Sequence, residues 1–423
     1  MMDITFETPS QVDKLADFAI EKILSARNRV LYVAFLFTNN RVWNALKSKV
    51  IEGVQVTVLA PPITSYSGDV IPKAFEIYND AANLASERNN FSFYVCPLWW
   101  QKDRSLTYLR SLINVAYTLH AKLLVVDDST YLPSSNFESA RHYDVCVYSD
   151  DRNLADECYT FSQDLIEFSV DMKQTAHASL PDMIREAARM TILSKVQTQK
   201  PFQFKHLLFV APFYRYEPQN YLRRQIARLL NESREFVDVM FQHFMPDVKP
   251  WSEPKSPNIM ETLITRHMQG VNVRLLAASG VSNKAAIKAE DAPMLKPLIS
   301  EKRIRRSTRV HAKFICTDKG FIIGSMNINP SSLLQAYFDQ KIKVDIDPSL
   351  HILLPDAIPK EYEAEKYGTI WQSTGFKSSV EVLMIQNWNE ENNHMKEKLR
   401  GFFNQSWSEV GQSSISSLQT SII

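Results

Sequence analysis

The chain has 423 residues, which exceeds one ordinary hydrophobic core and suits two domains. Hydrophobic residues make up 45% of it and charged residues 22%, so we expect a globular protein rather than a disordered one. The formal net charge of +1 excludes a molecule-wide field that would hold a polyanion, so contact with nucleic acid or anionic lipid requires a local patch.

The chain contains no uninterrupted stretch of about 18 apolar residues, which argues against a membrane span. Its first ten residues carry Asp3 and Glu7 and lack the basic and apolar regions of a secretory signal. We therefore expect a soluble, cytoplasmic protein.

A repeated order of elements organises the chain. It runs from an amphipathic helix to an apolar strand, then to a second helix that ends at a glycine, and closes with an alternating strand. In the first copy we expect the first helix at 15–23, the first strand at 30–37, a second helix that ends at Gly53 and the second strand at 54–59. In the second copy the same elements are expected at 222–230, at 236–241, up to Gly270 and at 271–276. Strand, helix and strand in succession form a parallel crossover, so two copies predict an α/β fold.

The repeat also predicts the domain boundaries. Each half closes with an amphipathic helix, at 154–168 and at 395–407. We expect a first domain at 1–177, a helical connector at 178–201, a second domain at 202–412 and a tail at 413–423.

The first half is longer than the second between its second strand and its histidine. Gly53 lies 67 residues before His120, whereas Gly270 lies only 41 residues before His311. We interpret the excess as an insertion at about 61–117, with a helix at 72–87 and a strand at 91–96. It ends near Trp99 and Trp100, which are either core residues or a lip over a substrate.

One short motif occurs in both halves. It reads His120-Ala-Lys122 with Asp127, Ser134 and Asn136 in the first half, and His311-Ala-Lys313 with Asp318, Ser325 and Asn327 in the second. Side chains alternate along a strand, so the histidine and lysine of each copy point the same way. Two facing copies would place two imidazoles and two ammoniums around one tetrahedral anion. Such a set supplies the nucleophile, acid and donors that a phosphodiester needs, without a metal.

Both motifs and the paired crossovers resemble the phospholipase D superfamily, over nearly the whole chain. The resemblance implies two phospholipase D-like α/β/α sandwich domains related by a pseudo-twofold axis, with the active site between them. It implies no cofactor and a phosphohistidine mechanism, in which we assign His120 as nucleophile and His311 as general acid, the reverse assignment being the alternative. We expect Lys122, Lys313, Asn136 and Asn327 to bind the phosphate oxygens, with Ser134 and Ser325 supporting them. Because one chain holds both half-sites, we expect a monomer.

A histidine nucleophile needs an acceptor that orients its other ring nitrogen. In single-motif relatives this is a carboxylate 28 residues after the histidine, and here that position is Asp339. In the first half the matching residue is Tyr148, which leaves Glu138 and Asp144 as candidates. The motif aspartates, Asp127 and Asp318, are interpreted as structural.

The substrate is less strongly indicated than the chemistry. A basic run, formed by Lys302, Arg303, Arg305, Arg306 and Arg309, ends two residues before His311. It is either a solvated face or a polyanion track, and His243 either lines the cleft or lies in the core. We favour a nuclease that hydrolyses DNA or RNA, with Trp99 and Trp100 as stacking platforms. The alternatives are a phospholipase D or phosphatidyltransferase acting on phospholipid head groups, and a binding protein without turnover.

Overall fold

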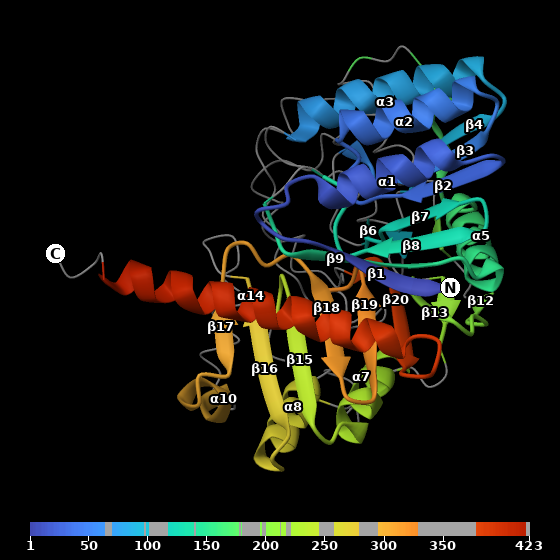
Figure 1. Ribbon diagram of the computed structural model, residues 1–423. Helices are drawn as coiled ribbons and strands as arrows, with labels where there is room; N and C mark the ends of the chain where they lie inside the picture. Colours follow the sequence, from blue (N-terminus) through green and yellow to red (C-terminus); the bar gives the residue numbers. More distant parts are fainter. Residues whose placement is uncertain are drawn as a thin grey trace, which may run out of the picture.

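The structure is a computed structural model. It describes residues 1–63, 70–96, 99–100, 117–138, 141–176, 179, 195–196, 200–211, 213–216, 221–244, 258–278, 295–328 and 378–419. The chain forms two mixed sheets, one in each half, with α1, α2 and α3 on the outside of the first and α7, α8 and α10 on the outside of the second (Figure 1). Helix α14 runs along the side of both sheets (Figure 1).

The first sheet has the strand order β1-β9-β8-β7-β2-β3-β4-β10. Its strands are β1 (Met2–Glu7), β2 (Arg29–Val33), β3 (Gln55–Ala60), β4 (Phe91–Val95), β7 (Leu123–Val126), β8 (Ser129–Pro133), β9 (Asp144–Ser149) and β10 (Val170–Asp171). Its helices are α1 (Lys14–Ser25), α2 (Asn40–Ile51), α3 (Val70–Glu87) and α5 (Arg152–Ile166). Strands β2, β3 and β4 are parallel to one another, as the crossover pattern predicts.

The second sheet repeats this arrangement with the order β13-β20-β19-β18-β15-β16-β17. Its strands are β13 (Leu207–Val210), β15 (Phe236–Phe241), β16 (Asn272–Ala277), β17 (Ile304–Arg306), β18 (Lys313–Thr317), β19 (Gly320–Gly324) and β20 (Ser378–Asn387). Its helices are α7 (Tyr221–Glu232), α8 (Ile259–Met268), α10 (Lys296–Ser300) and α14 (Asn393–Gln419). The matching strand orders confirm the internal repeat and the α/β fold of two similar domains.

Local sequence explains where the second helix of each crossover begins and ends. The side chain of Asn39 caps α2 by accepting hydrogen bonds from the backbone of Arg41 and Val42. Gly53 and Gly270 follow α2 and α8 with φ angles of 93° and 88°, a conformation that a residue with a Cβ atom adopts only at a cost. Each glycine therefore ends its helix and starts the turn into the next parallel strand.

Two expectations about the domain boundaries need correction, and a third lies mostly outside the described residues. Strand β4 takes the same place in its sheet as β17 in the other, so α3 and β4 belong to the repeated fold rather than to an insertion. Most of the expected helical connector, 178–201, lies outside the described residues, and its described part includes the short strands β11 (Lys195–Val196) and β12 (Lys200–Pro201). Helix α14 continues through the expected start of the tail to Gln419.

The two halves share one hydrophobic core. Buried residues from the inner faces of both sheets belong to a single cluster, which includes Phe161 of α5 stacked on Phe209 of β13 with ring centroids 4.2 Å apart. On the opposite side, Phe6 of β1 stacks on Phe402 of α14 at 4.5 Å. All four cysteines are buried and free, and no described helix is long and apolar enough to span a membrane.

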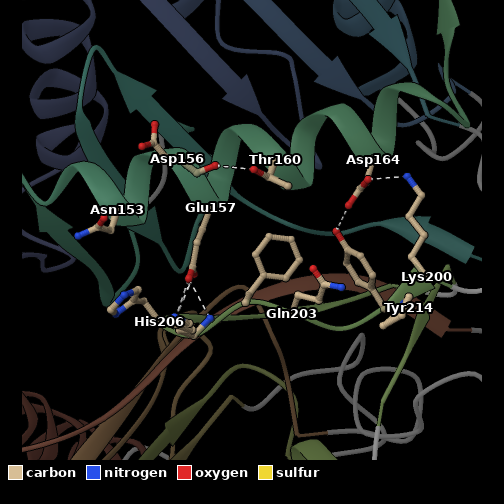
Figure 2. A pocket seen from close by; sticks show the side chains of 12 residues that line it. Asn153, Asp156, Glu157, Thr160, Asp164, Lys200, Gln203, His206 and Tyr214 are labelled. Carbon is tan, nitrogen blue, oxygen red and sulfur yellow. Dashed lines mark hydrogen bonds and ion pairs between the residues drawn. The ribbon is translucent and has the colours of Figure 1, made fainter.

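A cavity of about 660 Å³ lies between α5 and the strands that open the second half (Figure 2). Glu157 accepts hydrogen bonds from the backbone of 205–207, and Asp164 accepts from Tyr214 Oη and Lys200 Nζ, both at 2.6 Å. These contacts bind α5 to the second half. The carboxylates of Glu157 and Asp164 that line the cavity are thus engaged in this contact.

Candidate active site

Each histidine-bearing segment is hydrogen-bonded to a strand of the other half. Strand β6 (Tyr117–Leu119) leaves the first half and pairs with β20 of the second, and His120 N then donates to Val380 O at 3.0 Å. In the second copy, His311 N and Ala312 N donate to Tyr143 O at 3.2 and 2.7 Å. The two segments therefore meet at the boundary between the halves.

The side chains cross the same boundary. His120 Nδ1 lies 2.9 and 3.0 Å from the two carboxylate oxygens of Glu381, and His311 Nδ1 lies 2.9 Å from Asp144 Oδ1. An ionised carboxylate only accepts hydrogen bonds, so each histidine donates through Nδ1–H and keeps a lone pair on Nε2. Each ring is thus oriented by a carboxylate of the opposite half.

Ser134 and Ser325 support these carboxylates and do not bind phosphate as expected. Ser134 Oγ donates to Asp144 Oδ1 at 2.8 Å, and Ser325 Oγ donates to Glu381 Oε2 at 2.6 Å. Both serines are fully buried, and each hydroxyl has only one proton to donate. We correct their assignment from phosphate binding to orientation of the carboxylates.

The two lysines are almost completely buried beside the histidines. Lys122 Nζ lies 3.2 Å from His120 Nε2 and donates to His120 O at 2.8 Å. Lys313 Nζ donates to His311 O at 2.7 Å and, across the boundary, to Ser134 O at 3.0 Å. Burial and the neighbouring ammonium hold the pKa of Lys122 well below its usual value, and burial lowers the pKa of Lys313 to about 8.

Burial also lowers the pKa of both imidazoles and so favours their neutral forms. It lowers the pKa of His120 below its usual value and that of His311 to about 4, against the opposing effect of Glu381 and Asp144. Burial alone would raise the pKa values of both carboxyls, but the histidines and lysines outweigh it and lower them. At neutral pH the site therefore contains two neutral histidines and two carboxylates.

The asparagines of the motif are fixed by the loops that follow β2 and β15. Asn136 Oδ1 accepts hydrogen bonds from Phe35 N and Leu36 N at 3.0 Å, and Asn327 Oδ1 accepts from His243 N at 3.1 Å. With the amide oxygens engaged, each NH₂ group is the end that can donate to an anion.

The motif aspartates hold the turns that enter these same strands. Asp127 accepts hydrogen bonds from the backbone of Arg27, Asn28 and Arg29 at 2.8 to 3.0 Å. Asp318 accepts from Arg234 N at 2.9 Å and from the following backbone N–H at 3.3 Å. Both act on the backbone at the strand end remote from the histidines.

Sequence reasoning missed several residues near the site. Glu381 follows its histidine motif much later than the spacing that led to Asp339, and Asp339 lies outside the described residues. The His142 ring stacks on that of His311 with centroids 5.4 Å apart, and Phe35 packs against His120 at 5.0 Å. His243 lies near Lys313 and His120. Burial, together with the repulsion from these two groups, lowers the pKa of His243 to about 4.

Two expected orienting assignments changed. Asp144 orients a histidine, but it is His311 of the second half rather than His120 of its own half. Glu138 accepts a hydrogen bond from Thr38 N at 3.2 Å instead of contacting a catalytic ring, and burial raises its pKa to about 7.

The basic run does not form one continuous track. Lys302 and Arg303 lie before β17, at the edge of the sheet opposite the site, and Arg303 donates to Asn272. Arg305 packs over the Trp407 ring at 4.4 Å and donates to Trp407 O. Arg306 and Arg309 are exposed, and Arg309 O accepts from Tyr143 N beside the site. Trp99 and Trp100 form the short strand β5, and their side chains lie outside the described part of the structure.

Comparison with known proteins agrees with this architecture. Residues 226–345 match the family described as "Cardiolipin synthase, PLD-like domain". The structure of phosphatidylserine synthase from Haemophilus influenzae Rd KW20 aligns with a TM-score of 0.60 at 14% identity, covering 95% of this chain and 86% of that chain. The phospholipase D family member Nuc from Salmonella typhimurium aligns at 16% identity with a TM-score of 0.30, over 40% of this chain and 98% of its own. No curated protein sequence matches the chain.

Residues 226–345 thus match a PLD-like domain, and nearly the whole chain shares the fold of the aligned synthase structure. In this chain each half brings one histidine–lysine motif to the site.

Proposed function

We propose that the protein cleaves a phosphodiester through a phosphohistidine intermediate and that its substrate is a phospholipid. The observation that carries the mechanism is the pair of crossed contacts, His120 to Glu381 and His311 to Asp144, which makes Nε2 the reactive nitrogen of each ring. Buried ammonium groups beside both rings supply the positive charge that a pentacovalent phosphorus requires.

In the first step, His120 Nε2 attacks phosphorus, the bond to the leaving oxygen breaks, and His311 gives that oxygen its proton. In the second step, His311 removes a proton from water or an alcohol, which attacks the phosphohistidine and breaks the P–N bond. The low pKa of His311 in the free protein is compatible with this role because a bound phosphate anion favours the protonated ring. Lys122, Lys313, Asn136 and Asn327 hold the non-bridging oxygens throughout, and no metal takes part.

The choice of a phospholipid departs from the nuclease favoured by the sequence. The basic run that motivated a nuclease is divided between the site edge, α14 and the opposite edge of the sheet. Phe35 and Leu36 are partly exposed beside His120 and give the site an apolar rim. The description of the matching family names cardiolipin synthase, and the aligned structure is that of a phosphatidylserine synthase. Both names support a phospholipid substrate.

A nuclease is the second candidate because Arg309 is exposed two residues before His311. Purified protein in chelator should be incubated separately with phospholipid vesicles, single-stranded DNA, double-stranded DNA and RNA, with His311→Ala as the control. We expect head-group release from the vesicles and an acid-labile phosphoenzyme after rapid quenching. Cleavage of nucleic acid alone would overturn the lipid assignment, and a strict metal requirement would overturn the mechanism.

A further inference from the structure

The C-terminal helix reaches the active site through one side chain. Tyr143 Oη donates to Glu409 Oε2 of α14 at 2.5 Å, and the Tyr143 ring packs edge-on against Phe402, with centroids 6.3 Å apart. The other carboxylate oxygen of Glu409 accepts from Gln405 Nε2 at 2.8 Å, which fixes the carboxylate along the helix. Tyr143 is only 2% exposed, so its phenol depends on this acceptor.

Tyr143 lies at the centre of a segment that contacts His311 in three ways. Its carbonyl oxygen accepts from the backbone of His311 and Ala312. The preceding residue, His142, stacks on the His311 ring at an interplanar angle of 16°. The following residue, Asp144, accepts from His311 Nδ1. A displacement of this segment would therefore change the ring's position, its face contact and its hydrogen bond together.

The two half-sites differ in how firmly these segments are held. Glu381 pairs with β13 and Asp144 pairs with β1, and in both strands the ladder on the other side begins two residues later, at Leu383 and at Cys146. The difference lies before the carboxylates, because Ser378–Val380 form a three-residue ladder with β6. Before Asp144, the described backbone is tied to the second half through Tyr143 alone, in a single bridge to Val310. The His311 half-site thus has the greater need of a side-chain anchor.

We propose that Glu409 is a positioning residue that fixes Tyr143 and thereby the hydrogen bond between Asp144 and His311. The claim about geometry stands independently, whereas its consequence for turnover rests on the proposed function. The packing of helix α14 is then linked to one of the two half-sites.

The test compares Glu409→Ala and Tyr143→Phe with two controls. Glu409→Gln keeps an acceptor oxygen for the phenol, and Lys398→Ala removes a different contact between α14 and the first half, the ion pair with Asp3. The readout is low-field proton NMR of the two histidine Nδ1–H groups, assigned with His120→Ala and His311→Ala. The His120 signal serves as the internal reference in every variant.

We expect Glu409→Ala and Tyr143→Phe to remove or broaden the His311 signal while the His120 signal stays, and both controls to keep both signals. On a phosphodiester with an alkoxide leaving group, which needs a proton from His311, kcat should fall about 10- to 100-fold in Glu409→Ala with little change in KM, as for other residues that orient reacting groups. Glu409→Gln should recover most of the rate. An intact His311 signal in Glu409→Ala, or its loss in Lys398→Ala as well, would overturn the proposal. The NMR readout needs no substrate. If the protein showed no phosphodiesterase activity, the proposed function would be disproved, but the NMR comparison would still test the role of Glu409.

Discussion

His120 and Glu381 are 261 residues apart in the chain, yet the imidazole of one lies within hydrogen-bond distance of both carboxylate oxygens of the other. Asp144 and His311 repeat the relationship in the opposite direction. Among the described residues, neither motif histidine is paired with a carboxylate of its own half. A functional site therefore requires the two halves to dock, and their shared core holds them in that arrangement.

The orienting carboxylates should matter nearly as much as the histidines. In Glu381→Gln an amide NH₂ replaces an acceptor beside His120 Nδ1 and favours the tautomer with its proton on Nε2, where nucleophilic attack is blocked. We expect kcat to fall about 10²- to 10⁴-fold, as when the carboxylate of a catalytic triad becomes an amide. Steady-state kinetics on bis(p-nitrophenyl) phosphate would measure this.

Glu138→Gln is the matched control for that substitution, because Glu138 contacts the backbone of Thr38 and neither catalytic ring. It should leave kcat nearly unchanged. A comparable loss in Glu138→Gln and Glu381→Gln would mean that the contact between Glu381 and His120 has no special role.

The leaving group should distinguish the two histidines. His311→Ala removes the proposed acid, so its kcat should fall about 10²- to 10⁴-fold on a substrate with an alkoxide leaving group. The kcat of this variant should fall much less on a p-nitrophenyl ester, because that leaving group needs no proton. His120→Ala removes the nucleophile and should be inactive on both. If instead His120→Ala were the variant rescued by the p-nitrophenyl ester, the roles would be reversed.

Anion binding should weaken in alkaline solution. The pKa of Lys313 is lowered to about 8, so this ammonium is present below that pH and loses its proton as the pH rises through it. Sulfate keeps its charge over this range, and its affinity should be level from about pH 6 to 7 and then fall by up to about tenfold per unit above pH 8. Isothermal titration calorimetry would measure the affinity.

Lys319→Ala is the control for the pH profile, since Lys319 is 45% exposed and lies beyond the end of β18. The profile of this variant should match the original. An affinity that stays constant up to pH 10 would show that no lysine with a lowered pKa contacts the anion.

The motif aspartate should contribute to stability rather than to chemistry. Asp127→Ala removes the acceptor for three backbone N–H groups and places alanine at a φ of 52°, which favours asparagine, aspartate or glycine. We expect the free energy of unfolding to fall by about 1 to 3 kcal/mol. In contrast, Asp128→Ala should change it by no more than about 0.5 kcal/mol because Asp128 is 54% exposed. Urea denaturation would measure both, and equal effects would contradict the structural role.

The sequence by itself determined the repeat, the parallel crossovers and the two histidine–lysine pairs. These features are local: periodicity within about ten residues predicts a helix or strand, and His120 and Lys122 share a face because alternate residues along a strand do. Turn residues such as Gly53 and Gly270 carry the same kind of signal. The order of elements then predicted two similar halves.

Only the tertiary structure decided which carboxylate serves which histidine. Spacing within one half led to Asp339 as the partner of His311, but His311 pairs with Asp144 of the first half and His120 pairs with Glu381 of the second. The serine of each motif meets its carboxylate within one sheet, since β8 and β19 lie beside β9 and β20. The pairing of each histidine with its carboxylate instead depends on how the two sheets dock, which is set by the summed burial of many apolar side chains and leaves no short-range pattern in the sequence.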